Sequence, residues 1–173
     1  MLKFLSYDVV FQEVPNEVTL AINISGCPNR CRGCHSPWLM EDAGEPLDEA
    51  ALARLLREYG SAITCVCFMG GDAAPREVER LAAALRRANR HRLKVAWYSG
   101  RQTLPDGCSL QRFDFVKLGP YIAPLGGLDC ATTNQRFYRI ENGKMLDETE
   151  RFRKEEKEKF VNPINSSTFA VTK

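Results

Sequence analysis

The chain has 173 residues, with 24 lysines and arginines against 22 aspartates and glutamates, and 44% of its residues are hydrophobic. These values describe one compact domain and leave no room for a second full one. A net charge of +2 lacks the basic excess that binding to a phosphate backbone requires, so we expect no nucleic-acid partner.

The sequence also argues against a membrane or secreted protein. No apolar run approaches the roughly 20 residues that cross a bilayer, and the N-terminal segment carries Asp8 and Gln12 where a signal sequence would be apolar. We therefore expect a cytoplasmic location and no membrane partner. Seven cysteines in a reducing compartment argue against a disulfide framework and favour a metal or redox role.

In chain order, predicted strands alternate with predicted helices. Residues 18–25 alternate apolar with small or polar side chains, which predicts a strand. Residues 27–38 contain two prolines and a glycine and are expected to form a loop. Residues 47–60 carry apolar side chains every four positions, acids in the first turn and a final glycine, which predicts a helix.

The alternation continues along the rest of the chain. The further predicted elements are a strand within 61–72, a helix over 75–92, strands over 93–100 and 113–119, a loop over 120–135 and a hairpin over 136–146. This order predicts an α/β fold with a mainly parallel sheet. Residues 150–173 differ in composition and are expected to form a charged helix and a polar C-terminal tail, outside a core domain of residues 1–149.

Three cysteines carry the clearest chemical signal. Cys27, Cys31 and Cys34 lie four and then three positions apart in the predicted loop, where an irregular backbone lets three thiolates converge. A closed zinc site or an electron-transfer [4Fe-4S] cluster uses four protein ligands, so three ligands leave one iron open to a small molecule. This pattern is typical of a catalytic site.

The spacing of these cysteines after a strand resembles the cluster-binding loop of the radical S-adenosylmethionine (SAM) enzymes. The segments GCPNRCRGCHSPW, FMGGD, WYSGR and GPYIAPLGGLDCATTNQRFYRI resemble the activating proteins of anaerobic ribonucleoside-triphosphate reductases, over roughly residues 7–140. The resemblance implies that the core domain 1–149 is an incomplete (partial) radical SAM β/α barrel. It also implies two cofactors, a [4Fe-4S] cluster held by the three cysteines and SAM. One departure is Gly33, where the wider superfamily often has an aromatic residue.

The resemblance further implies an activating enzyme that makes a glycyl radical. An electron from the cluster cleaves SAM, and the 5′-deoxyadenosyl radical removes a hydrogen atom from a backbone glycine of the partner. The implied partners are the large catalytic subunit of the anaerobic reductase, as the protein substrate, and a flavodoxin-like or other low-potential electron donor.

Four further residues are predicted to bind SAM. Gly70, Gly71 and Asp72 follow a predicted strand, and in the family this motif holds the amino group of SAM. Because Asp72 is one methylene shorter than the more common glutamate, we expect an indirect or backbone-assisted contact. Ser99 is expected to hydrogen-bond the carboxylate or ribose of SAM. The simpler alternatives are a strand-end turn at 70–72 and a local hydroxyl cap at Ser99.

The remaining cysteines have simpler interpretations. Cys65 and Cys67 share one face of a predicted strand and are expected to be core residues, while Cys108 and Cys130 are expected to be bystander thiols in loops. His35 is expected to make a local hydrogen bond. The basic stretch 86–94 is expected to be solvated surface, with docking of an acidic electron donor as the alternative.

Three other functions remain open at this stage. An activating enzyme for a different glycyl-radical enzyme, such as the formate-lyase type, would use the same reaction. A radical SAM enzyme acting on a small molecule would share the cysteine loop. A non-enzymatic iron-sulfur or zinc-binding module would recruit a fourth thiol, with Cys65 or Cys67 as the candidates. The polar loop over 119–135 is expected to lie beside the partner or the mouth of the site.

Overall fold

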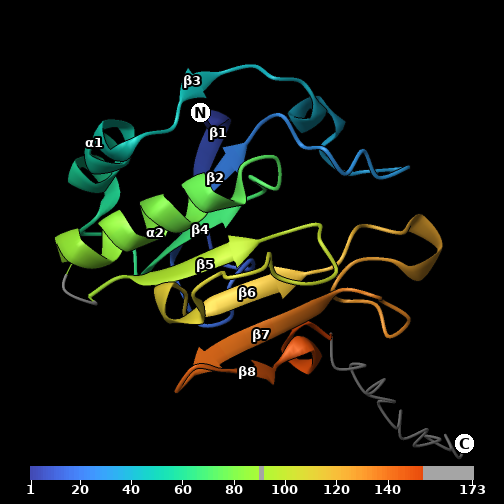
Figure 1. Cartoon of the computed structure of the whole chain (residues 1–173). Coiled ribbons are helices and arrows are strands. Elements are labelled where there is room, and N and C mark those ends of the chain that lie inside the picture. Colours follow the sequence, from blue (N-terminus) through green and yellow to red (C-terminus); the bar gives the residue numbers. More distant parts are fainter. Residues whose placement is uncertain (90–91, 154–173) are drawn as a thin grey trace, which may run out of the picture.

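The computed structural model describes residues 1–89 and 92–153, which form one eight-stranded sheet with two α-helices (Figure 1). The strands are β1 (Lys3–Val10), β2 (Thr19–Ile24), β3 (Glu45–Pro46), β4 (Cys65–Met69), β5 (Lys94–Tyr98), β6 (Phe115–Leu118), β7 (Arg136–Glu141) and β8 (Lys144–Asp147). The helices are α1 (Glu49–Tyr59) and α2 (Pro75–Asn89). Short 3-10 helices are η1 (Pro37–Met40), η2 (Leu110–Arg112), η3 (Ala123–Leu125) and η4 (Thr149–Phe152).

The sheet is mixed, so the prediction of a mainly parallel sheet in an incomplete radical SAM β/α barrel is wrong. The strand order is β3-β1-β2-β4-β5-β6-β7-β8. The central strands β2, β4, β5 and β6 pair in parallel, whereas β1 and β3 at one edge and β7 and β8 at the other pair antiparallel. Four of the seven pairings are therefore antiparallel.

Two features of the chain produce this difference. The strand β1 was not predicted because its burial does not alternate, yet it adds to β2 as an antiparallel neighbour. At the other edge, the hairpin predicted over 136–146 forms β7 and β8, and β7 pairs antiparallel with β6. Parallel pairing thus stops at the four central strands.

Both α-helices pack on one face of the sheet. The first begins at Asp48, whose carboxylate accepts a hydrogen bond from the Ala51 amide at 2.8 Å, as expected of an N-cap. Apolar side chains of the two helices, including Leu55 and Leu81, are buried against Ile22, Phe68 and other residues of the central strands. The predicted helices over 47–60 and 75–92 are thereby confirmed within the residues that the structure describes.

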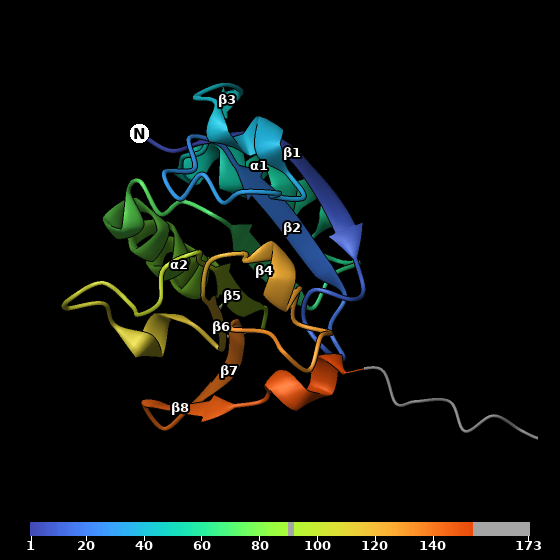
Figure 2. The same ribbon diagram turned by 90° about the vertical axis from the view of Figure 1, so that its right-hand side faces the viewer.

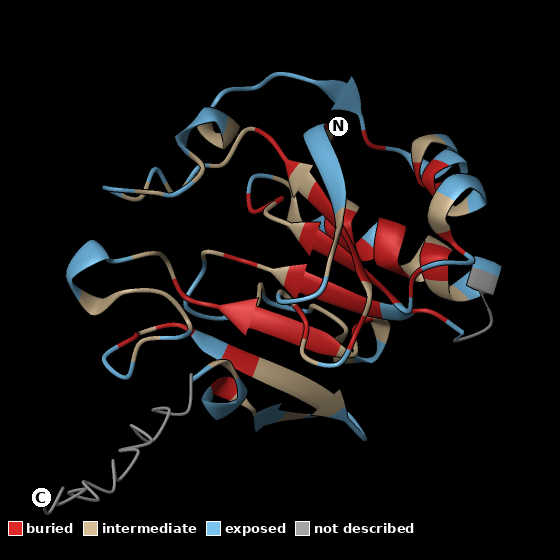
Figure 3. Cartoon of the chain, turned by 180° about the vertical axis from the view of Figure 1, so that it is seen from behind, coloured by how far each residue is buried: buried red, intermediate tan, exposed pale blue. Residues whose placement is uncertain are grey.

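Loops cover the opposite face of the sheet (Figure 2). The fully buried Val14 lies in the connection between β1 and β2 and packs in one cluster with Cys65, Cys67 and Phe137. Phe152 of η4 contacts the same cluster, with its ring centroid 4.9 Å from that of Phe137. Because both faces are covered, the central strands are almost continuously buried, while half of β1 and most of β8 are exposed (Figure 3).

Two further predictions concern the C-terminal segment and membrane-spanning helices. The charged helix and tail predicted over 150–173 lie outside the described residues from position 154 onward, and Thr149–Phe152 form the 3-10 helix η4. Over residues 1–89 and 92–153, neither helix combines the length and the apolar composition that a membrane span requires.

Candidate metal centre

The cysteine loop leaves the sheet at the carboxyl end of β2. Gly26 has a φ of 70°, in the left-handed region that glycine adopts without strain, and it turns the chain out of the strand. The amides of Gly26 and Cys27 donate to the carbonyls of Glu41 and Leu39 at 2.9 Å each, so the two ends of the loop are tied together. The loop therefore projects from the edge of the sheet where ligands bind in open α/β folds (Figure 1).

The structure brings the three predicted ligands together. Cys27, Cys31 and Cys34 are all partly exposed and line one cavity of about 170 Å³. The other lining residues are Asn23, Ile24, Ser36, Leu39, Met40, Met69, Gly70 and Tyr98. No fourth cysteine and no histidine is among these described lining residues. The cavity thus offers three thiols and an apolar wall.

The spacing and the surroundings of the three thiols bear on the metal group that they could hold. Within the described parts of the chain, no three His, Cys, Asp or Glu side chains are grouped closely enough to hold one metal ion. In a [4Fe-4S] cluster each cysteine binds a different iron, so its sulfur ligands stand farther apart than ligands around one zinc. Donors face two of the sulfurs, since Asn29 Nδ2 lies 3.7 Å from Cys27 Sγ and the Ser36 amide 3.4 Å from Cys34 Sγ.

Gly70 and Gly71 follow β4 and have different surroundings. Gly70, with a φ of 101°, lines the cavity beside the cysteines, and its carbonyl accepts a hydrogen bond from Trp97 Nε1 at 2.8 Å. Gly71 is buried, and a Cβ there would lie 2.5 Å from Cγ2 of Val78 in α2. The first glycine therefore allows close approach from the cavity, and the second allows close packing of the helix.

Asp72 and Ser99 do not line this cavity but bond to each other behind it. Asp72 is 2% exposed, and its carboxylate accepts hydrogen bonds from Ser99 Oγ at 2.6 Å, from the Gly100 amide at 2.8 Å and from Asn29 Nδ2 at 2.5 Å. Ser99 is 1% exposed, and its hydroxyl also accepts from the Arg101 amide. Both side chains are thus occupied by protein partners that tie three segments together.

A row of side chains crosses the sheet beneath the cysteine loop. In register, Asn23 pairs with Met69, Met69 with Tyr98, and Tyr98 with Lys117, so the four residues occupy corresponding positions on β2, β4, β5 and β6. Lys117 is 8% exposed, and its Nζ donates to the Gly119 carbonyl at 2.7 Å.

Lys117 is a buried cation close to the site that sequence reasoning missed. Burial lowers its pKa to about 8, against the opposing effect of the negative charges of Asp72, Cys31 and Cys34. The local sequence did not indicate that Lys117 is buried, because a lysine between the apolar residues Val116 and Leu118 fits the solvent-facing side of a strand equally well. Only the pairing of strands reveals its position.

The remaining cysteines lie away from the cavity. Cys65 and Cys67 are fully buried in the cluster on the loop-covered face, and Cys67 Sγ lies 3.4 Å from Met69 Sδ. Burial raises the pKa of both thiols above the ordinary value, which keeps them protonated. Their prediction as core residues is confirmed. Burial also raises the pKa of the partly exposed Cys108, and Cys130 packs where a Cβ on Gly126 would stand.

The loop that follows β6 packs against the cysteine loop, as the right-hand side of Figure 1 shows. The rings of Tyr121 and His35 are 4.5 Å apart, and a Cβ on Gly33 would lie 3.4 Å from Cβ of Ala123. A shallow apolar groove of about 660 Å³ runs along this contact, lined by Arg32, Gly33, Tyr121, Ile122, Ala123 and Pro124. Through Arg32 and Gly33 the groove includes part of the cysteine loop, although it shares no lining residue with the cysteine cavity.

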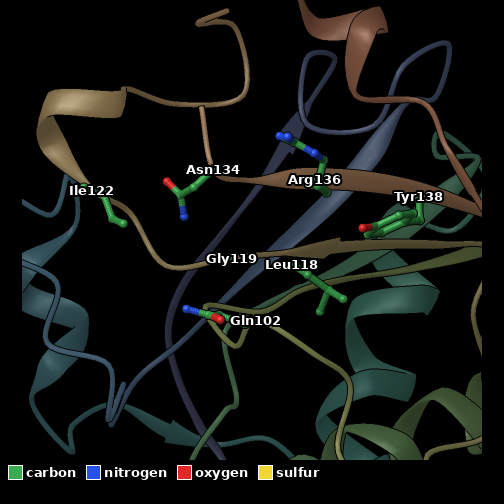
Figure 4. Close-up of a pocket in the computed structure, with 7 residues that line it drawn as sticks. All are labelled: Gln102, Leu118, Gly119, Ile122, Asn134, Arg136 and Tyr138. Atoms are coloured by element: carbon green, nitrogen blue, oxygen red, sulfur yellow. The ribbon is translucent and has the colours of Figure 1, made fainter. Parts of the chain in front are cut away.

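A more polar pocket of about 300 Å³ adjoins the same loop (Figure 4). Its lining residues are Gln102, Leu118, Gly119, Ile122, Asn134, Arg136 and Tyr138. Asn134 Nδ2 donates to the Pro120 carbonyl at 2.9 Å. The buried Oδ1 of the same side chain has no hydrogen-bond partner among the described residues. Ile122 lines both this pocket and the apolar groove, so the two hollows adjoin at that residue.

The basic stretch over 86–94 is only partly available for docking. Arg86 is largely buried and pairs with Asp114 at 2.7 Å, and Lys94 pairs with Glu17 at 2.5 Å. Arg87 lies 3.7 Å from Glu49 with two thirds of its side chain exposed. Residues 90 and 91 of this stretch lie outside the described residues.

The fold and the site define a mixed α/β protein whose first parallel strand leads into a three-cysteine loop. Residues 17–113 match the family of 4Fe-4S single cluster domains, and this match spans more than half of the chain. The chain therefore belongs to that family, which confirms its predicted iron-sulfur character. The comparisons with curated proteins and with solved structures gave no match.

Proposed function

We propose that the chain is a radical SAM activating enzyme, which cleaves SAM at a [4Fe-4S] cluster and generates a glycyl radical on an anaerobic ribonucleoside-triphosphate reductase. The observation that carries the proposal is the cavity in which three cysteines and the strand-end Gly70 meet without a fourth cysteine or histidine among its described lining residues. Three protein ligands leave one iron free to bind a small molecule.

Different residues bind the cluster and SAM. Cys27, Cys31 and Cys34 hold the cluster, and the partly exposed Gly70, whose carbonyl also accepts from Trp97 Nε1, receives the amino group of SAM. Asp72 and Ser99 contribute to SAM binding indirectly, because their side chains are hydrogen-bonded to each other and to neighbouring amides. These hydrogen bonds support an indirect role for Asp72 in SAM binding. When bound, the reduced cluster supplies the electron that cleaves SAM into methionine and a 5′-deoxyadenosyl radical.

A protein substrate is favoured by the surface around the cysteine loop. The apolar groove along Arg32, Tyr121 and Pro124 is open, and the polar pocket of Figure 4 adjoins it. Ile122, which lines both hollows, is 40% exposed, and Trp38 of η1, just after the three cysteines, is 58% exposed. A contiguous apolar surface such as this groove, rimmed by polar residues, is typical of a site that receives another protein. The large subunit of the reductase is the proposed occupant, and a low-potential donor such as a flavodoxin supplies the electron.

The first test concerns SAM cleavage. The chain is reconstituted anaerobically with iron and sulfide, reduced with dithionite and mixed with SAM, and 5′-deoxyadenosine is measured. We expect product from the wild type and from Cys108→Ala, whose thiol lies outside the cavity. We expect Cys31→Ala to lose both bound iron and product, by at least tenfold, because the cluster then lacks a ligand.

A cluster that loads fully but neither binds nor cleaves SAM would contradict the proposal and favour an electron-transfer module. Loss of the cluster in Cys65→Ala or Cys67→Ala would favour a four-ligand site. If SAM is cleaved, addition of the reductase large subunit tests the substrate, and the glycyl radical is read as its electron paramagnetic resonance signal. SAM cleavage without that signal would contradict the reductase as substrate and would favour another glycyl-radical enzyme or a small molecule.

A further inference from the structure

A buried carboxylate links the cysteine loop to the ends of two parallel strands. Asp72 follows β4, and its three hydrogen-bond donors come from Asn29 in the cysteine loop and from Ser99 and Gly100 after β5. A buried carboxylate loses its hydration and needs such donors in compensation. The guanidinium of Arg101 adds a bond to the Asp72 carbonyl at 2.8 Å. The position of Asn29 is therefore set by residues more than forty positions away in the sequence.

Asn29 also faces a predicted cluster ligand. Its Nδ2 lies 3.7 Å from Cys27 Sγ as well as 2.5 Å from Asp72 Oδ2. A carboxamide nitrogen carries two hydrogens, so it can serve both acceptors at once. The Asp72 carboxylate takes one N–H and orients the other toward the sulfur.

Gly100 gives independent evidence that Asn29 is held closely in this position. A Cβ on Gly100 would lie 2.3 Å from Nδ2 and 2.9 Å from Cγ of Asn29, which is closer than real contacts allow. The backbone of Gly100 does not adopt a left-handed conformation, so space and not backbone geometry requires glycine there. The glycine of the WYSGR segment therefore makes room for the Asn29 carboxamide.

We propose that Asn29 is a positioning residue that raises the reduction potential of the cluster through its contact with Cys27, and that Asp72 and Gly100 hold it there. Hydrogen bonds to cluster sulfurs stabilise the more negative, reduced state and so raise the potential. The proposal rests on the proposed function only for cluster binding at the three cysteines. It does not require SAM cleavage.

The test measures the midpoint potential of the reconstituted full chain by redox titration followed by electron paramagnetic resonance. Asn29→Ala and Gly100→Ala are expected to shift the potential downward, the first by deleting the donor and the second by displacing it. Gly127→Ala is the matched control, because Gly127 also lacks a left-handed backbone and an added Cβ there comes no closer than 3.4 Å to any neighbour. Its potential should equal that of the wild type.

A second measurement uses the chain without cluster, so that it does not depend on loading. Hydrogen exchange of the backbone amides over residues 27–34 should become faster in Asp72→Ala and Gly100→Ala than in the wild type and in Gly127→Ala. Wild-type potentials in Asn29→Ala and Gly100→Ala would overturn the proposal. If those variants fail to load a cluster, unchanged exchange in Asp72→Ala and Gly100→Ala would overturn it. A wild-type chain that binds no cluster would instead contradict the proposed function.

Discussion

Lys117 shows how a single residue couples the site to stability. Its ammonium is buried beneath the cysteine loop, and the folded chain holds this proton less tightly than the unfolded chain, with a pKa of about 8 against 10.5. The free energy of unfolding should therefore rise with pH between these values, because the unfolded state binds more protons there. At pH 7 the charged lysine costs on the order of 3 kcal/mol.

Lys117→Met tests this cost in the chain without cluster. We expect the variant to be more stable than the wild type at pH 7 in urea unfolding, with an advantage that shrinks by roughly 2 kcal/mol by pH 9.5 as the wild-type lysine loses its proton. Lys144→Met, at an exposed position in β8, is the control and should show no such trend. Parallel stability curves for wild type and Lys117→Met would refute the explanation.

The site residues differ in how far they could be predicted from the sequence. The cysteines were accessible because ligand spacing within one loop is a local property. Asn29 was not, since its bond to Asp72 joins residues that are distant in the chain. Lys117 also escaped, because only the strand register brings it below the loop. Contacts between residues that come together only on folding produce no local pattern in the sequence.

At the scale of elements, α1 offers a clean test of local helix signals. Asp48 caps its first turn by accepting from the Ala51 amide at 2.8 Å. Asp48→Ala should lower the free energy of unfolding by about 1 kcal/mol, because one helical N–H loses its acceptor. Chemical denaturation measures the change, and iron content after reconstitution should stay at the wild-type level, since α1 does not line the cavity.

Asp42→Ala is the comparison for that variant. Asp42 also carries an exposed carboxylate, and its ion pair with Lys3 at 3.1 Å lies at the surface. Exposed pairs contribute little, so the change should stay within about 0.5 kcal/mol. Equal losses of stability in Asp42→Ala and Asp48→Ala would argue against a specific capping contribution from Asp48.

The central elements were predictable because each has a clear periodicity and a clear end. Strands β2, β4, β5 and β6 and both helices match the predicted segments, as does the closing hairpin of β7 and β8. The strand β1 was missed, because half of its residues are exposed, only Phe4 is buried, and no alternation marks an inner face. The missed strand accounts for two of the four antiparallel pairings, and the predicted hairpin supplies the other two by joining the same sheet next to β6.

At the scale of the whole molecule, cluster binding should stabilise the fold. The cysteine loop is tied to the strand ends through Asn29 and Asp72, and a ligand that binds only the folded state shifts the unfolding equilibrium. We expect the reconstituted chain to unfold at a higher urea concentration than the chain without cluster, by an amount equivalent to a few kcal/mol. Anaerobic denaturation followed by circular dichroism measures the difference.

Removal of iron with a chelator should return the midpoint to that of Cys31→Ala, which lacks a cluster ligand in either condition. A midpoint that does not respond to iron in the wild type would mean that the loop is uncoupled from the sheet. A response that survives in Cys31→Ala would place the metal elsewhere in the molecule.

The alternation of side chains along the central strands separates two kinds of change in this protein. In β4, Val66 and Phe68 face the helices, whereas Cys67 and Met69 face the loops and the cysteine cavity. Substitutions at the first set alter packing throughout the sheet, and substitutions at the second set, near the strand ends, alter what the cavity accepts. Adjacent positions of one strand therefore act separately, so the lining of the cavity can be altered at Met69 while the helical layer that packs on Val66 and Phe68 stays unchanged.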